Sequence, residues 1–107
     1  MSIRIAVASK DGKVVTDHFG HCSSFSILEA EHGIFHFIGY REVVPPCSGG
    51  EHTREAIDAV LEKLTDCSYI VVNRIGGGAI RILEERQFKV IVHKGYVRDA
   101  LEDINLT

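Results

Sequence analysis

Apolar residues recur at every second position near the start of the chain. Ile3, Ile5 and Val7 share one face of an extended segment, a period typical of a β-strand. Glu31-His32-Gly33 is a short, glycine-containing connection between two further apolar segments, which predicts a hairpin. The strands are predicted at residues 3–8, 25–30 and 34–44, with a brief extension at residues 14–16.

The hydrophobic period changes in the second half of the chain. Amphipathic segments with apolar residues three and four positions apart predict helices. Ser48-Gly49-Gly50-Glu51 has the spacing of a capping box at the start of the first of them. Between them lie near-continuous apolar runs, typical of strands buried on both faces. The helices are predicted at residues 51–64, 77–86 and 96–104, and the strands at residues 69–73 and 89–92.

This order of elements predicts an α/β fold. Strands that alternate with helices pair in parallel, so residues 3–8, 69–73 and 89–92 are expected to form parallel neighbours. The hairpin adds antiparallel strands, which gives a mixed five-stranded sheet with helices on both faces. The 107 residues fit one domain, residues 1–107.

Composition and charge exclude several classes of protein. Twelve Lys and Arg against fifteen Asp and Glu give a net charge of −3, which argues against a nucleic-acid binder. No apolar run approaches the roughly 20 residues of a membrane helix. The N-terminal residues lack the apolar core of a signal peptide, so a cytoplasmic location with free thiols is expected.

The loop Asp17 to Ser24 carries unusual density of metal-ligating residue types. His18 and His21 are three positions apart, and Cys22 follows directly. Imidazole and thiolate suit zinc, copper, iron and iron–sulfur species. Spacing alone favours the alternative of a polar surface loop, because four-ligand sites normally show two pairs.

Cys47 lies between two prolines and two glycines, in a loop expected to be exposed. It fits a thiolate ligand or a reactive thiol near a helix start, and equally a cysteine without chemistry. His52 follows one turn later and could join the same site. Cys67 precedes a buried strand and is expected to be buried. His32, His36 and His93 are interpreted as structural or solvated.

Gly76, Gly77 and Gly78 end a strand and begin a helix. Free amides there could hold an anion, and missing side chains would let a ligand approach. The alternative is a tight turn in which Gly77 or Gly78 adopts backbone angles open mainly to glycine. Arg81 rules out the dinucleotide-binding fingerprint, and no Walker lysine follows. The chain shows no catalytic set.

Several segments resemble the dinitrogenase iron–molybdenum cofactor-binding family, which includes NifX-type carriers and the C-terminal domain of NifB-type synthases. They are Ile3 to Ser9, Asp17-His18-Phe19-Gly20-His21, Asp66-Cys67 before an apolar strand, and Ile75-Gly76-x-Gly. Residues 42–50, with Pro46-Cys47 followed by Gly49-Gly50, are most similar to the NifB-type domain and to small stand-alone proteins like it. The resemblance covers nearly the whole chain.

The resemblance implies a ribonuclease H-like three-layer fold and non-enzymatic binding of an iron–sulfur or iron–molybdenum-type cluster for transfer between donor and acceptor proteins. A molybdenum–copper sulfide cluster is the alternative cargo. The synthase's Cys-x-x-x-Cys-x-x-Cys motif is not in this sequence, so no cluster-building catalysis is assigned. The implied cofactor-binding residues are His18, Phe19, Gly20, His21, Cys47, Gly76, Gly77 and Gly78. The candidate metal ligands are His18, His21 and Cys47, with His52 and Cys22 as auxiliaries.

Two other functions stay open on the sequence. One is a thiol-dependent, enzyme-like protein that uses Cys47 with a histidine. The other is an interaction or regulatory domain without a cofactor. For the cluster carrier, the loop after the first strand, the loop before the first helix and the Gly76 turn are predicted to converge beyond the carboxyl ends of the parallel strands.

Overall fold

The computed structural model describes residues 3–46, 54–102 and 104. The elements are β1 (Ile3–Val7), β2 (Val14–Val15), the 3₁₀ turn η1 (Phe19–His21), β3 (Ser24–Glu31), β4 (Ile34–Glu42), α1 (Arg54–Glu62), β5 (Tyr69–Val72), α2 (Gly77–Glu85), β6 (Lys89–Val92), β7 (Gly95–Tyr96) and α3 (Val97–Leu101).

The main sheet has five strands in the order β4-β3-β1-β5-β6. β1 pairs antiparallel with β3 and parallel with β5, and β5 pairs parallel with β6. The predictions of a mixed five-stranded sheet and of parallel strands near residues 3–8, 69–73 and 89–92 are therefore confirmed. A two-residue turn joins β3 to β4: His32 and Gly33 have φ angles of 54° and 78°, the signature of a type I′ hairpin.

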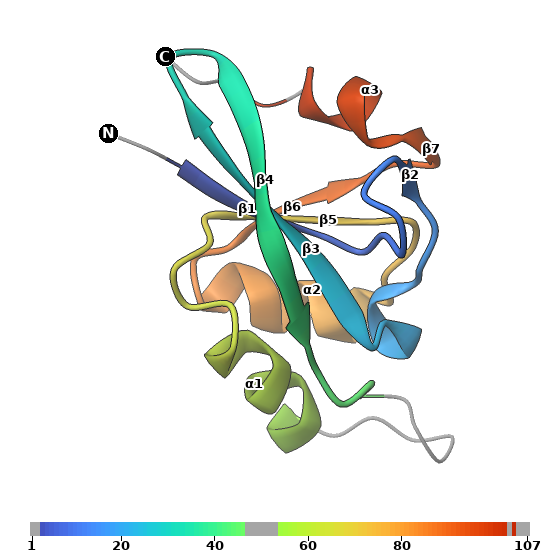
Figure 1. The fold of residues 1–107 in the computed structure, drawn as a ribbon. Helices are drawn as coiled ribbons and strands as arrows, with labels where there is room; N and C mark the ends of the chain where they lie inside the picture. The colour runs from blue at the N-terminus through green and yellow to red at the C-terminus, as the bar shows by residue number, and fades with distance from the viewer. Residues whose placement is uncertain (1–2, 47–53, 103, 105–107) are drawn as a thin grey trace.

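Helices cover both faces of the sheet (Figure 1). α1 and α2 pack on one face, where the core includes Phe19, Phe25 and Leu61. α3 packs on the other face against a second cluster that includes Val7 and Leu101. The sheet therefore separates two cores. Within the described residues, two nine-residue helices lie on one side and a five-residue helix lies on the other.

The structure differs from the sequence predictions at several element ends. α1 ends at Glu62, but Leu64 remains buried in the turn that follows. The predicted helix at residues 96–104 is only five residues long, although Ile104 is still buried. The predicted start of the first helix, with its capping box at residues 48–51, lies outside the described residues.

β2 and β7 form a separate two-stranded ribbon, with Val14 opposite Tyr96 and Val15 opposite Gly95. The brief extension at β2 was predicted, whereas β7 was not, since two residues are too short to show a period. Among the described residues, no helix has the length and apolar character needed to cross a membrane.

Candidate functional site

The loop that carries His18 is joined to the chain just after β5. The Asn73 N–H donates to the carbonyl of Asp17 over 3.0 Å, and the Phe19 N–H donates to that of Arg74 over 2.9 Å. His18 and Arg74 thus form a short parallel bridge. Because β1 and β5 are parallel, these residues lie beyond their carboxyl ends, where ligands bind in open α/β sheets. This loop thus lies beside Arg74, two residues before the Gly76 turn. The loop before the first helix lies largely outside the described residues, so the convergence of all three segments stays a prediction.

The turn η1 sorts its side chains into two faces. In a 3₁₀ turn, side chains three positions apart eclipse each other. Phe19 and Cys22 are both buried in the core under α1 and α2, whereas His18 and His21 are both exposed. The Phe19 ring packs 6.4 Å from that of Phe25, centroid to centroid, so Phe19 anchors the loop from below.

The rings of His18 and His21 are close enough to share a metal. Their centroids are 5.9 Å apart, and the rings meet edge to face. Two imidazoles on one tetrahedral ion, with metal–nitrogen bonds of about 2.0 Å, have centroids roughly 5 Å apart. The observed centroid separation is therefore within about 1 Å of the separation that a shared metal atom requires.

Cys22 does not suit the auxiliary ligand role given to it on the sequence. Its side chain is fully buried, and its thiol donates to the carbonyl of Ser24 over 3.1 Å. Burial raises the pKa of this thiol to about 12, which disfavours the thiolate that metals require. We correct that assignment: Cys22 is a core residue, and it follows the two histidines in sequence without sharing their exposed face.

Cys67 is also buried, as the sequence predicted. Burial, together with the neighbouring Asp66 carboxylate, raises the pKa of its thiol to about 11. The two described cysteines are therefore both unfavourable thiolates at neutral pH.

The glycine turn has an unexpected conformation. Gly76 has φ −75° and ψ 155°, and neither Gly77 nor Gly78 has a positive φ. The predicted glycine-only backbone angles are therefore wrong. A Cβ at any of these three glycines would meet no atom within 4 Å, so open space lies beside the first residues of α2. Neither packing nor backbone geometry requires glycine at these three positions.

Asn73 and Arg74 belong to this site and were missed in the sequence. The Asn73 side-chain amide donates to the carbonyl of Val15 over 3.1 Å and fixes the loop. Arg74 is exposed, and within the described part of the chain it has no ion pair. Their position directly after a buried parallel strand was the available signal.

The segment that leads to Cys47 passes the same loop. The Val43 N–H donates to the carbonyl of Ser23 over 2.9 Å, two residues after His21, and Pro46 is buried. Cys47 and His52 lie outside the described residues. Within the described ranges no third His, Cys, Asp or Glu side chain joins His18 and His21 to form a metal site.

The family described as "Dinitrogenase iron-molybdenum cofactor" matches residues 1–106. The chain belongs to this family. It is 38% identical over 77 residues to the FeMo cofactor biosynthesis protein NifB of Herbaspirillum seropedicae, covering 72% of this chain and 15% of that protein. It is 36% identical over 105 residues to NifB of Frankia alni, covering 95% of this chain and 21% of that protein. The chain thus spans about a fifth or less of these relatives.

A solved structure extends the similarity to the fold. The apo form of the orange protein of Desulfovibrio gigas matches with a TM-score of 0.61 and 18% sequence identity, over 92% of this chain and 83% of that one. At this identity the similarity concerns the α/β fold alone.

Proposed function

We propose that this family member is a small, non-enzymatic carrier or scaffold for an iron–sulfur or iron–molybdenum-type cluster. One observation carries the proposal. The exposed imidazoles of His18 and His21, with ring centroids 5.9 Å apart, lie on a loop that is hydrogen-bonded to the chain beyond the carboxyl end of β5. Membership of a family named for the iron–molybdenum cofactor supports the choice of cargo. A molybdenum–copper sulfide cluster remains the alternative.

The proposed ligands are His18 and His21, with Cys47 and His52 completing the set. Imidazole and thiolate are suitable donors for iron at a cluster surface. The exposed amides at Gly76, Gly77 and Gly78 would approach cluster sulfides, with no side chain in the way. Few protein ligands and an exposed position suit a carrier, which must release its cargo.

Charge supports the same placement. Iron–sulfur clusters bound by thiolates are anionic, and the start of α2 carries the positive end of its helix dipole. The Arg74 guanidinium adds a full positive charge at this edge of the sheet, within a chain whose net charge is −3. We assign Arg74 to attraction of the cluster, with the histidines as ligands.

The finer features of the protein follow as part of this proposal. Residues 1–107 form one cofactor-binding domain, in the cytoplasm, with cluster donor and acceptor proteins as partners and neither nucleic acid nor membrane. The fold is ribonuclease H-like: an antiparallel hairpin on one side of β1 and parallel strands on the other support this class.

Anaerobic reconstitution tests the proposal. The chain is incubated with iron and sulfide, with and without molybdate, and is then measured by absorption spectroscopy and metal analysis. The parent should gain charge-transfer bands and bound metal, whereas His18→Ala and Cys47→Ala should lose at least about tenfold in cluster affinity, since a ligand matters no less than its supporting groups. The matched control is His36→Ala, which removes an exposed histidine from β4.

The outcomes separate the three functions. A parent chain that binds no metal under these conditions would exclude the carrier. Selective reaction of Cys47 with a thiol probe would then indicate the thiol-dependent protein, and an unreactive Cys47 would indicate the cofactor-free domain. For a carrier, cluster should also pass from a loaded chain to an isotopically heavy empty chain, as measured by native mass spectrometry.

A further inference from the structure

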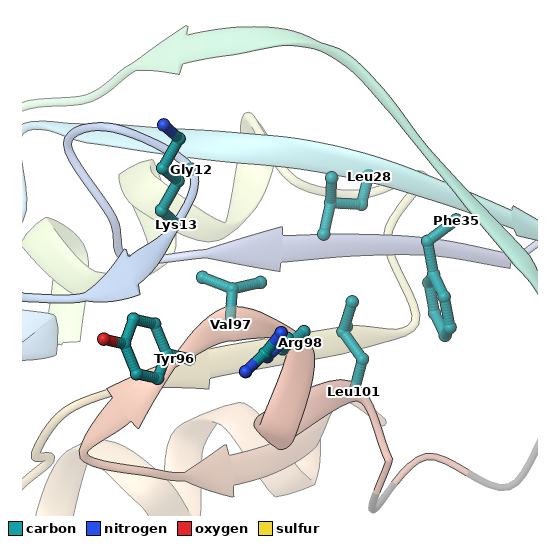
Figure 2. Close-up of a pocket in the computed structure, with 8 residues that line it drawn as sticks. All are labelled: Gly12, Lys13, Leu28, Phe35, Tyr96, Val97, Arg98 and Leu101. Atoms are coloured by element: carbon teal, nitrogen blue, oxygen red, sulfur yellow. The ribbon is translucent and has the colours of Figure 1, made fainter.

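A pocket opens on the α3 face of the sheet, where the helical cover is thin. It has a volume of about 460 Å³ and lies between α3 and the β3–β4 hairpin. That volume is within the range of small-molecule sites. Figure 2 shows Leu28 and Phe35 on the hairpin side and Val97, Arg98 and Leu101 on the α3 side.

The wall of the pocket is largely apolar. Leu28, Val97 and Leu101 are nearly buried, whereas Phe35 is only half-buried. Next to Phe35 on this face, β4 presents Phe37 and Tyr40, which are 51% and 54% exposed and whose ring centroids are 5.0 Å apart. Phe37 pairs with the lining residue Leu28, so an exposed aromatic surface lies beside the pocket. Exposed apolar patches of this kind often mark binding sites.

The rim of the pocket is held in place without a ligand. The Val97 N–H donates to the carbonyl of Lys13 over 2.8 Å, and Val14 pairs with Tyr96 across the β2–β7 ribbon. The Asp11 carboxylate accepts the N–H groups of Lys13 and Val14 over 2.8 and 3.1 Å. These bonds tie the turn before β2 to the start of α3, so the pocket is pre-formed.

Two cations belong to this rim, Lys13 and Arg98. Neither is held in a close ion pair among the described residues. The Asp11 carboxylate near Lys13 is anionic, since the backbone N–H groups of Lys13 and Val14 lower its pKa, but it makes no ion pair with the Lys13 ammonium. The Arg98 guanidinium lies 5.5 Å from the centre of the Tyr96 ring, and among the described residues its one ion pair is a long, exposed contact of 3.8 Å with Asp99. An apolar pocket with a cationic rim fits one class of ligand.

We propose that this pocket binds a small amphipathic carboxylate. Its aliphatic or aromatic body lies between α3 and the β3–β4 hairpin, and its carboxylate stays at the rim in the field of Lys13 and Arg98. The site is distinct from the proposed cluster site, because Phe19 and Ala79, which support that site, belong to the core on the opposite face of the sheet. Ligand binding in this pocket therefore does not require a cluster at the other site.

Nuclear magnetic resonance of the ¹⁵N-labelled full chain tests this proposal, with octanoate as the probe and octan-1-ol as the neutral match. Octanoate should shift amide signals of the pocket residues, above all Gly12, Val97 and Leu101, in a saturable manner. Octan-1-ol should bind several-fold more weakly. Residues at the cluster site, such as His18, should not shift.

Charge variants isolate the role of the rim. Lys13→Gln with Arg98→Gln should weaken octanoate binding about threefold to tenfold, the range of two exposed ion pairs, and should leave octan-1-ol unaffected. The control variant, Lys63→Gln with Arg81→Gln, removes the same charge from exposed positions just after α1 and on α2. It should change the binding of neither octanoate nor octan-1-ol. Raising salt from about 0.05 to about 0.5 M should weaken octanoate binding to the parent chain and gives the same information if the rim variant fails to fold.

Two results would overturn the proposal. If octanoate at millimolar concentration shifts no pocket signal, the pocket does not take this class of ligand. If octanoate and octan-1-ol bind equally and salt has no effect, the rim plays no part and the pocket is merely apolar.

Discussion

The imidazole rings of His18 and His21 meet edge to face with their centroids 5.9 Å apart, on the exposed side of the turn that buries Phe19. If both bind the same cluster, the two substitutions act on one unit and their effects do not add. We expect His18→Ala, His21→Ala and the double variant to lose cluster affinity by similar factors, at least about tenfold each. Metal content after anaerobic reconstitution measures this. Independent, multiplying losses would show that the rings do not share a cargo.

The Asp66 carboxylate links the turn after α1 to β4 and to β1. Arg41 on β4 hydrogen-bonds to both oxygens, and Arg4 on β1 donates to one of them over 2.6 Å. Arg41, and then Arg4, hold the pKa of Asp66 far below its ordinary range against the opposing effect of partial burial. The side chain is 35% exposed, so solvent screens these pairs. Asp66→Asn should lower the free energy of unfolding by about 1 kcal/mol near neutral pH.

The pH dependence of that loss has a definite sign. Because the folded-state pKa of Asp66 is depressed, its contribution is complete above the unfolded value of roughly 3.9 and is lost as the pH falls below it. Urea unfolding of the parent and of Asp66→Asn should therefore converge in acid. Glu84→Gln, an exposed change on α2, is the control and should differ little from the parent at any pH. A gap that persists undiminished in acid would mean that the loss has a cause other than charge.

The sequence predicted those parts of the fold that have a period. Alternating and continuous apolar runs identified the five main strands, and the glycine after His32 identified the hairpin. β7 was missed because Gly95 and Tyr96 are too few to show a period. α3 was predicted too long because the buried Ile104 continues the helical spacing after the helix has ended.

The candidate site was predicted less completely, for a geometric reason. Adjacency in sequence placed Cys22 with His21, but successive residues of a turn face different ways. In η1 the i, i+3 rule places Cys22 with Phe19 in the core and His21 with His18 outside. Arg74 was missed because only a backbone bridge brings it beside His18, which lies 56 positions earlier in the chain.

The buried thiols give a test that needs no cofactor. Burial raises the pKa of Cys22 to about 12 and that of Cys67 to about 11, so both are almost entirely protonated near neutral pH. Iodoacetamide at about pH 8 should therefore label neither in the folded chain, whereas all three cysteines should react in urea. Mass spectrometry of peptides locates the label. The sequence predicts that Cys47 is the residue labelled under native conditions, and fast native labelling of Cys22 would contradict its place in the core.

Gly77 lies at the start of α2 with ordinary backbone angles and open space where a Cβ would be. Alanine there costs nothing in packing and favours the helix, so Gly77→Ala should raise the free energy of unfolding by about 0.5 kcal/mol. The added methyl group would also occupy the space through which a cluster reaches the amides, and cluster affinity should fall. Glu84→Ala, in the same helix but away from its start, should leave affinity unchanged. Denaturant unfolding and anaerobic metal analysis on the same preparations decide the matter. Opposite changes in stability and affinity would mark the glycine as retained for its ligand, whereas unchanged affinity would reduce the turn to a connection between β5 and α2.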